Sequence, residues 1–133
     1  MQSVGIDWGT RKAAWCALDE PGELSGEGVI PADEDGLARL VHRLGPDVSA
    51  CVEMMSGAVW VCDRLVATGW RMQVADARKV RAVAPLACKT DRVDARVLAE
   101  LVRRDLVPAL WVTVPSVSGC GGARTWCDSA PRR

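Results

Sequence analysis

The sequence predicts a single α/β domain in which a mixed sheet carries helices on its faces. Two observations lead to this prediction. Residues 3–30 fall into three short segments with strand character that are joined by tight turns, as in an antiparallel meander. From residue 33 onward, segments with helical periodicity alternate with short apolar runs, which is typical of βα units.

Each predicted element has its own local signal. Turn residues at 9–12 and 20–23 separate the first three strands, an acidic triplet opens the first helix at Asp33, and Gly45-Pro46 stops it. The predicted strands cover residues 3–8, 13–18, 24–30, 48–53 and 71–75, and the predicted helices cover 33–44, 58–67, 77–87 and about 91–104. The chain therefore reads as β β β α β α β α α.

Composition limits the class of protein. With 133 residues, 49% hydrophobic and 26% charged, the chain is long enough for one folded core. It has no apolar run of the roughly 18 residues that a membrane span needs, and no basic leader, so we expect a soluble, cytoplasmic protein. The six cysteines form no C-x-x-C pair, which argues against a zinc site or a disulfide framework.

Charge is distributed unevenly along the chain. Residues 1–63 carry 4 basic and 11 acidic side chains, a net charge of −7, and residues 64–133 carry 13 and 6, a net charge of +7. A basic half of this kind can meet a phosphate backbone while an acidic site holds cations. An internally paired, amphoteric surface explains the same distribution equally well.

Four carboxylates are candidate metal ligands. Asp7 lies in the first strand on a face that flanking glycines clear, and Glu53 ends a short buried strand. Asp91 and Asp94 are three residues apart at the start of the last helix, so they share one helical face. Oxygen ligands of this kind suit Mg²⁺ or Mn²⁺. Acidic residues in a first turn also complement the helix dipole, with Thr90 as the N-cap, and that reading explains the helical pair without a metal.

Three stretches resemble the N-terminal half of the DEDD transposases of insertion sequences, the group that includes the Piv-type DNA invertases. They are Val4-Gly5-Ile6-Asp7, Val52-Glu53 followed by Ser56-Gly57, and Lys89-Thr90-Asp91-x-x-Asp94-Ala95-x-x-Leu98-Ala99-Glu100-Leu101. The resemblance covers residues 3 to about 112, and its last stretch is the most specific.

The resemblance implies a RuvC-like fold within the ribonuclease H superfamily. It also implies that Asp7, Glu53, Asp91 and Asp94 match the family's four metal-binding catalytic acids, which hold Mg²⁺ or Mn²⁺. The implied activity is cleavage and transfer of DNA strands during transposition, guided by a structured RNA from the same element. We expect DNA as the partner, together with a homo-oligomeric state and no membrane association.

Basic residues around the last two helices are candidate nucleic-acid contacts. They are Arg78, Lys79, Arg81, Lys89, Arg92 and Arg96. Solvated helix faces account for them equally well.

The domain prediction divides the chain at residue 112. Residues 1–112 form the RuvC-like domain, and residues 113–133 form an irregular tail without apolar periodicity. The family's C-terminal domain with its nucleophilic serine is expected to be absent, because the serines at 116, 118 and 129 match no family motif. We therefore expect a truncated gene product.

Two other functions stay open. The chain could be a catalytically incomplete fragment that binds nucleic acid or dimerises. More remotely, residues 6–10 also resemble the first phosphate loop of the actin and sugar-kinase phosphotransferases, although the chain is too short for their second lobe.

Overall fold

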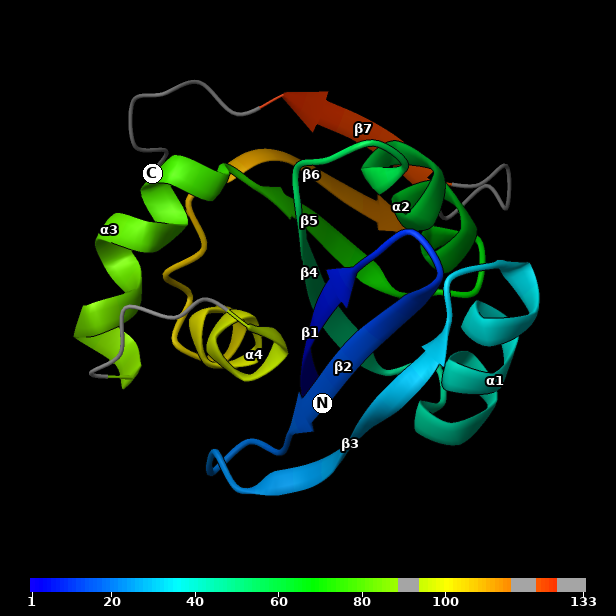
Figure 1. Cartoon of the computed structure of the whole chain (residues 1–133), viewed down its shortest axis with the longest axis horizontal. Coiled ribbons are helices and arrows are strands. Elements are labelled where there is room, and N and C mark those ends of the chain that lie inside the picture. The colour runs from blue at the N-terminus through cyan, green and yellow to red at the C-terminus, as the bar shows by residue number, and fades with distance from the viewer. Residues whose placement is uncertain (89–93, 116–121, 127–133) are drawn as a thin grey trace.

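The computed structural model describes residues 1–88, 94–115 and 122–126, which form a seven-stranded mixed sheet with four helices (Figure 1). The order of the strands across this sheet is β3-β2-β1-β4-β5-β6-β7. Their bounds are β1 Gln2–Trp8, β2 Lys12–Leu18, β3 Leu24–Pro31, β4 Val48–Glu53, β5 Arg71–Ala75, β6 Ala109–Pro115 and β7 Gly122–Trp126.

Strand direction changes at β1, near the middle of the sheet. Strands β1, β2 and β3 are antiparallel neighbours, whereas β1, β4 and β5 run parallel, and β6 and β7 add an antiparallel edge. The carboxyl ends of β1 and β4 therefore lie next to each other. The predicted meander and mixed sheet are confirmed.

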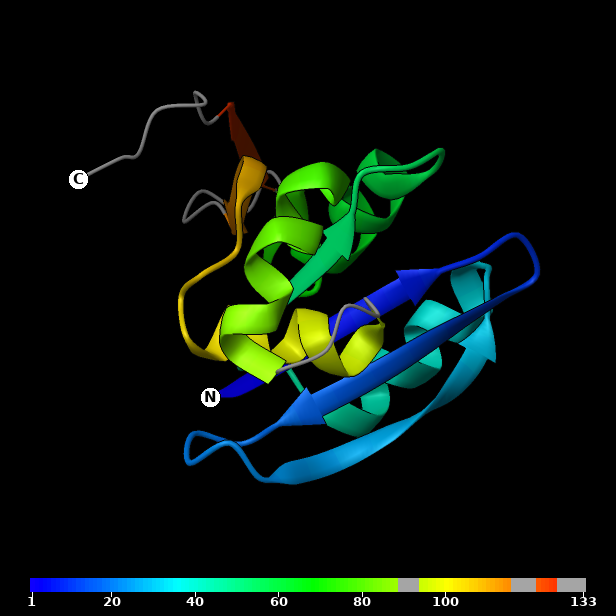
Figure 2. The same ribbon diagram turned by 60° about the vertical axis from the view of Figure 1, so that its left-hand side comes forward.

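The helices cover both faces of the sheet. Helices α1 Glu34–Leu44 and α2 Ala58–Val66 lie on one face, and α3 Ala77–Cys88 and α4 Ala95–Arg103 lie on the other (Figures 1 and 2). The Asp33 side chain caps α1 by accepting the Gly36 backbone N–H at 2.8 Å. Asp76 accepts the backbone N–H groups of Arg78 and Lys79 at 2.9 and 3.3 Å, which fixes the start of α3.

Strand alternation divides the buried residues between these faces. Val4 and Ile6 of β1 point toward α1 and α2, where they join a large apolar cluster around Trp70. Cys51 and Ala75 face α3 and α4, in a smaller cluster with Leu98. Because side chains alternate along a strand, Gly5 and Asp7 lie on the α3/α4 face.

The start of α4 corrects one sequence prediction. The helix was expected to begin at Asp91 with Thr90 as its cap, but its first residue is Ala95, and the extended Asp94, with φ −138°, caps it. The Asp94 carboxylate accepts the Val97 backbone N–H at 3.1 Å. Because Asp94 precedes the helix, the helical spacing used to pair it with Asp91 does not apply. Asp91 itself lies outside the described residues.

Two segments of the tail predicted as irregular, residues 113–115 and 122–126, belong to strands. Residues 109–115 form β6, which pairs antiparallel with β5, and residues 122–126 form β7 beside it. The pairing supplies backbone hydrogen bonds that do not require an apolar repeat, which explains why periodicity alone missed it. None of the helices among the described residues is long and apolar enough to cross a bilayer.

Candidate functional site

Two of the four predicted acids lie on adjacent parallel strands. Gly5 of β1 pairs with Cys51 of β4, and Ile6 pairs with Val52. The next residues along the two strands, Asp7 and Glu53, are therefore neighbours. Neighbouring strands lie about 4.8 Å apart. Both carboxylates stand on the α3/α4 face at the carboxyl ends of their strands. The structure thus brings together two residues that are far apart in the sequence.

The surroundings of Glu53 disfavour its charged form. Partial burial raises the pKa of the Glu53 carboxyl, and the neighbouring Asp7 carboxylate raises that pKa further. The Arg81 guanidinium on α3 acts in the opposite direction and lowers the pKa. The fold therefore holds two carboxylates close enough to repel each other, a situation that a bound cation would relieve.

Helix α4 lies directly on β1 because Gly5 has no side chain. A Cβ on Gly5 would overlap the Ala95 carbonyl oxygen and would lie 2.5 Å from the Ala99 nitrogen. Small residues of α4 and of the adjacent strand β2, including Ala95, Ala99 and Cys16, pack beside this contact. Close approach of the helix backbone to the strand follows from these small side chains.

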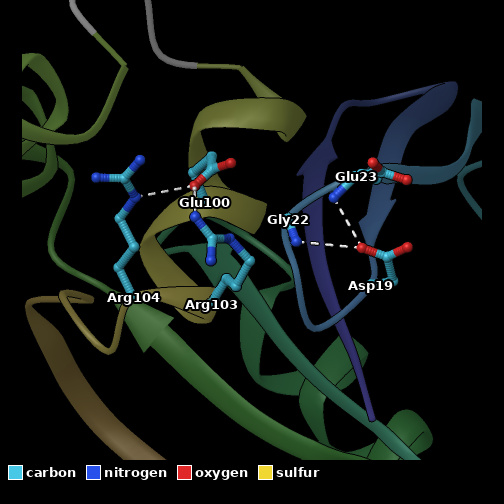
Figure 3. A network of polar contacts seen from close by, with 6 residues as sticks. All are labelled: Asp19, Gly22, Glu23, Glu100, Arg103 and Arg104. Atoms are coloured by element: carbon cyan, nitrogen blue, oxygen red, sulfur yellow. Dashed lines mark hydrogen bonds and ion pairs between the residues drawn. The ribbon is translucent and has the colours of Figure 1, made fainter.

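The far end of α4 fixes its direction across the sheet. Its last residues lie beside the β2–β3 turn, where a Cβ on Gly22 would be 2.8 Å from the Arg103 guanidinium carbon. Glu100 accepts hydrogen bonds from Arg103 at 3.1 Å and Arg104 at 3.0 Å, and Asp19 closes the adjacent turn (Figure 3).

The β2–β3 turn lies at the amino end of β1, because Leu18 pairs with Ser3. The first residues of α4 therefore point toward the carboxyl end of β1 (Figure 2). Asp7 is the second-last residue of that strand.

The third predicted acid is used as a helix cap. Asp94 lies at the start of α4, at the end of the sheet that carries Asp7, but its carboxylate accepts the Val97 N–H. Within residues 1–88, 94–115 and 122–126, no three His, Cys, Asp or Glu side chains are grouped to hold a metal ion. The structure therefore forms an acid pair in this region, and the fourth predicted acid, Asp91, lies outside what it describes.

The predicted basic contacts take different positions. Arg78, Lys79 and Arg81 are exposed on α3, and Arg81 is close enough to Glu53 to affect its pKa. Arg96 is exposed in the first turn of α4. Burial raises the pKa of the nearby Cys16 thiol to about 11, and the Arg96 charge acts in the opposite direction. Lys89 and Arg92 lie outside the described residues.

Sequence reasoning missed a cavity at the β1–β2 hairpin. Its volume is about 420 Å³, and it is lined by Asp7, Gly9, Thr10, Arg11, Lys12, Ala14 and Val29. Residues 9–12 were predicted as a turn, with residues 6–10 as a remote phosphate-loop resemblance, and no role was predicted for Arg11 or Lys12. The signal that could have found the site is a pair of adjacent cations, Arg11 and Lys12, in an otherwise acidic half of the chain, a few residues from the candidate ligand Asp7.

Comparison with protein families gives one match that covers most of the chain. Residues 4–112 match the family model described as transposase, the DEDD type named after IS110. The match contains Asp7, Glu53, Asp91 and Asp94. No curated protein matches the sequence.

Proposed function

We propose a function for this chain, which belongs to the DEDD transposase family of the IS110 type. It is a metal-dependent domain for cleavage and transfer of DNA strands. The observation that carries the proposal is the pair Asp7 and Glu53. These carboxylates occupy adjacent parallel strand ends, and the pKa of Glu53 is raised partly by its neighbour. Keeping two repelling carboxylates side by side costs stability unless a cation is bound between them.

The donor set fits Mg²⁺ or Mn²⁺. Both ions prefer carboxylate oxygens, and Asp7 is exposed while Glu53 is half-buried, so an ion and its remaining waters have access. Asp7 and Glu53 would hold the ion, and Asp91 and Asp94 are the further ligands that we propose. A divalent ion in such a site stabilises the charge that develops on the oxygens of a phosphodiester during displacement.

The surrounding residues have roles that do not depend on the ion. We assign the exposed cations Arg78, Lys79 and Arg81 of α3 to the phosphate backbone of DNA, since they stand on the helix that contributes Arg81 to the surroundings of Glu53. Helix α4, docked on Gly5, fixes the distance between its own first turn and Asp7. In this assignment α3 positions the DNA strand, and β1, β4 and α4 form the floor of the site.

One observation favours a second function. The Asp94 carboxylate is engaged as the cap of α4, and among the described residues no third acid joins Asp7 and Glu53 in a metal-binding group. A domain with this arrangement that did not bind a metal would be a nucleic-acid-binding or dimerising fragment without catalysis. The two functions differ in whether Asp94 acts as a ligand as well as a cap.

A calorimetric titration with Mn²⁺ tests the proposal. We expect saturable binding by the parent chain and its loss in Asp7→Asn and Glu53→Gln, because each substitution removes a charged ligand while keeping the shape of the side chain. Asp35→Asn is the matched control, since Asp35 is an exposed acid of α1 that pairs with Arg39 on the opposite face of the sheet. Binding that survives both Asp7→Asn and Glu53→Gln would overturn the metal site.

Asp94→Asn separates the cap from the ligand. Asparagine is as good an N-cap as aspartate, so α4 should keep its stability, with a change in unfolding free energy below about 0.5 kcal/mol. Loss of Mn²⁺ affinity in this variant would identify Asp94 as a ligand. Unchanged affinity, with Asp94→Ala costing about 1 kcal/mol, would identify it as a cap alone.

A further inference from the structure

The β1–β2 hairpin places two cations next to the acid pair, on the side away from α3. We propose that Arg11 and Lys12 bind the sugar–phosphate backbone of a DNA strand that crosses the sheet over Asp7 and Glu53. The inference rests on the proposed function and extends it, because it assigns a second contact on the opposite side of the site from α3. The hairpin cavity, lined by Asp7, residues 9–12, Ala14 and Val29, is the place of contact.

Neither Arg11 nor Lys12 is paired with an acidic side chain in the part of the chain that the structure describes. Four basic residues occur in the first 63. Arg39 pairs with Asp35 at 2.8 Å, and the Arg43 guanidinium lies over the Trp15 ring at 5.1 Å. Arg11 and Lys12 are exposed, and within residues 1–88, 94–115 and 122–126 neither forms an ion pair, even with the nearby Asp7. Exposed cations around a cavity are the usual means of holding a phosphate backbone.

The hairpin holds both side chains on a fixed backbone. The Gly9 N–H donates to the Lys12 carbonyl oxygen at 3.0 Å, and a Cβ at Gly9 would come within 2.6 Å of the same oxygen. The Arg11 carbonyl accepts the Ala32 N–H at 2.9 Å, which ties the hairpin to the end of β3. Because the backbone is anchored on both sides, binding would order only the two side chains, which lowers the entropic cost of contact.

The sheet surface beside the hairpin is open in the direction a strand would take. Asp7 pairs with Ala14 and Ala14 pairs with Val29, so these residues and Glu53 form a row across β4, β1, β2 and β3. Three spacings between strands make the row about 14 Å long. Asp7 is exposed and Val29 is 61% exposed, so α4 covers the sheet around Gly5 but leaves the end of this row open.

The row accounts for the presence of both acidic and basic side chains at this site. The carboxylates occupy one end, and the cations of the hairpin flank the rest, with Ala14 and Val29 as a small apolar floor. A strand of DNA matches this order, since its sugars offer apolar surface and its phosphates offer negative charge. Together with α3, the hairpin would hold the strand on both sides of the acid pair.

Binding of a fluorescein-labelled DNA oligonucleotide to the intact chain tests the inference, measured by anisotropy between about 50 and 200 mM salt. We expect Arg11→Ala with Lys12→Ala to weaken binding about tenfold at the lower salt. The slope of log affinity against log salt should fall by about 1.4 for single strands and 1.8 for duplex, as the loss of two phosphate contacts requires. Arg39→Ala is the matched control, because Arg39 is an exposed cation on the opposite face, and its removal should leave both quantities unchanged.

A charge-preserving variant separates contact from folding. Arg11→Lys with Lys12→Arg should stay within about twofold of the parent affinity, since both cations remain. An alanine variant with the affinity and salt slope of the parent overturns the inference, and so does tighter, hairpin-dependent binding of RNA of the same sequence. The Mn²⁺ titration distinguishes the two proposals. If the chain binds Mn²⁺ through Asp7 but binds no DNA, the proposed hairpin contact is overturned and the proposed metal site stands. If the chain binds neither Mn²⁺ nor DNA, both proposals are overturned.

Discussion

The two faces of the sheet are built on different principles. The face under α1 and α2 is filled by large apolar side chains, with Ile6 and Trp70 fully buried. The face under α3 and α4 uses small residues such as Gly5, Cys51 and Ala75, and it ends in the acid pair. The face under α1 and α2 therefore supplies most of the hydrophobic stabilisation. On the face under α3 and α4, small side chains let helix α4 lie close to β1, the strand that carries Asp7.

The largest effect is expected from Trp70→Ala, on the large-residue face. Trp70 is 0% exposed, and its indole N–H donates to the Gly45 carbonyl at 2.8 Å, so the substitution leaves a cavity and an unpaired acceptor. We expect the free energy of unfolding to fall by about 4 kcal/mol, measured by chemical denaturation. Trp60→Ala is the control, because Trp60 is 37% exposed and its loss should cost well under half as much. Equal costs would contradict the assignment of the main core to this face.

A smaller loss is expected from adding volume on the other face. Gly5→Ala places a methyl group against the backbone of α4 at Ala95 and Ala99, and a helix backbone cannot move aside as a side chain can. We expect a loss of about 3 kcal/mol in unfolding free energy, together with weaker Mn²⁺ binding as α4 shifts. At Gly28 the atoms nearest to an added Cβ belong to the Trp15 ring, the closest at 3.3 Å, so Gly28→Ala should cost much less. A Gly5→Ala chain as stable as the parent would show that α4 does not need this contact.

The smallest effect concerns the charge of the acid pair. The pKa of Glu53 is raised in the folded chain, so between the ordinary value of 4.5 and the raised value the folded state binds more protons than the unfolded state. Stability contributed by this group is therefore present below about pH 4.5 and is lost as pH rises through the folded pKa. Glu53→Gln should gain stability relative to the parent as pH increases from about 4 to 7, by less than the Gly5→Ala effect.

Asp7→Asn sharpens this prediction, because the Asp7 carboxylate is one cause of the raised pKa. In an Asp7→Asn background the stabilising effect of Glu53→Gln at neutral pH should shrink. Urea denaturation of the four chains, in buffer without divalent ions, measures the coupling between the two carboxylates. An effect of Glu53→Gln that is the same in both backgrounds would show that the Asp7 carboxylate does not contribute to the raised pKa.

Prediction of the fold from the sequence was most successful where a pattern is local. The strands at 48–53 and 71–75 were predicted with the bounds that the structure has, because short apolar runs between turn residues mark them clearly. The start of α4 was missed by four residues, since Thr90, Asp91 and Asp94 are all good capping residues and local preference does not rank them. Strands β6 and β7 were missed because they have no apolar repeat of their own, and pairing with another strand holds each of them in place.

The sequence by itself determined the residue types of the site, the order of the elements as far as α4 and the family to which the chain belongs, since all three follow from local patterns of side chains. The tertiary structure alone decided which of those residues meet. The parallel register of β1 and β4 makes Asp7 and Glu53 neighbours, and the register of β1, β2 and β3 places Arg11, Lys12 and Val29 beside them. Strand pairing joins residues that are distant in the chain, and no local pattern specifies that pairing.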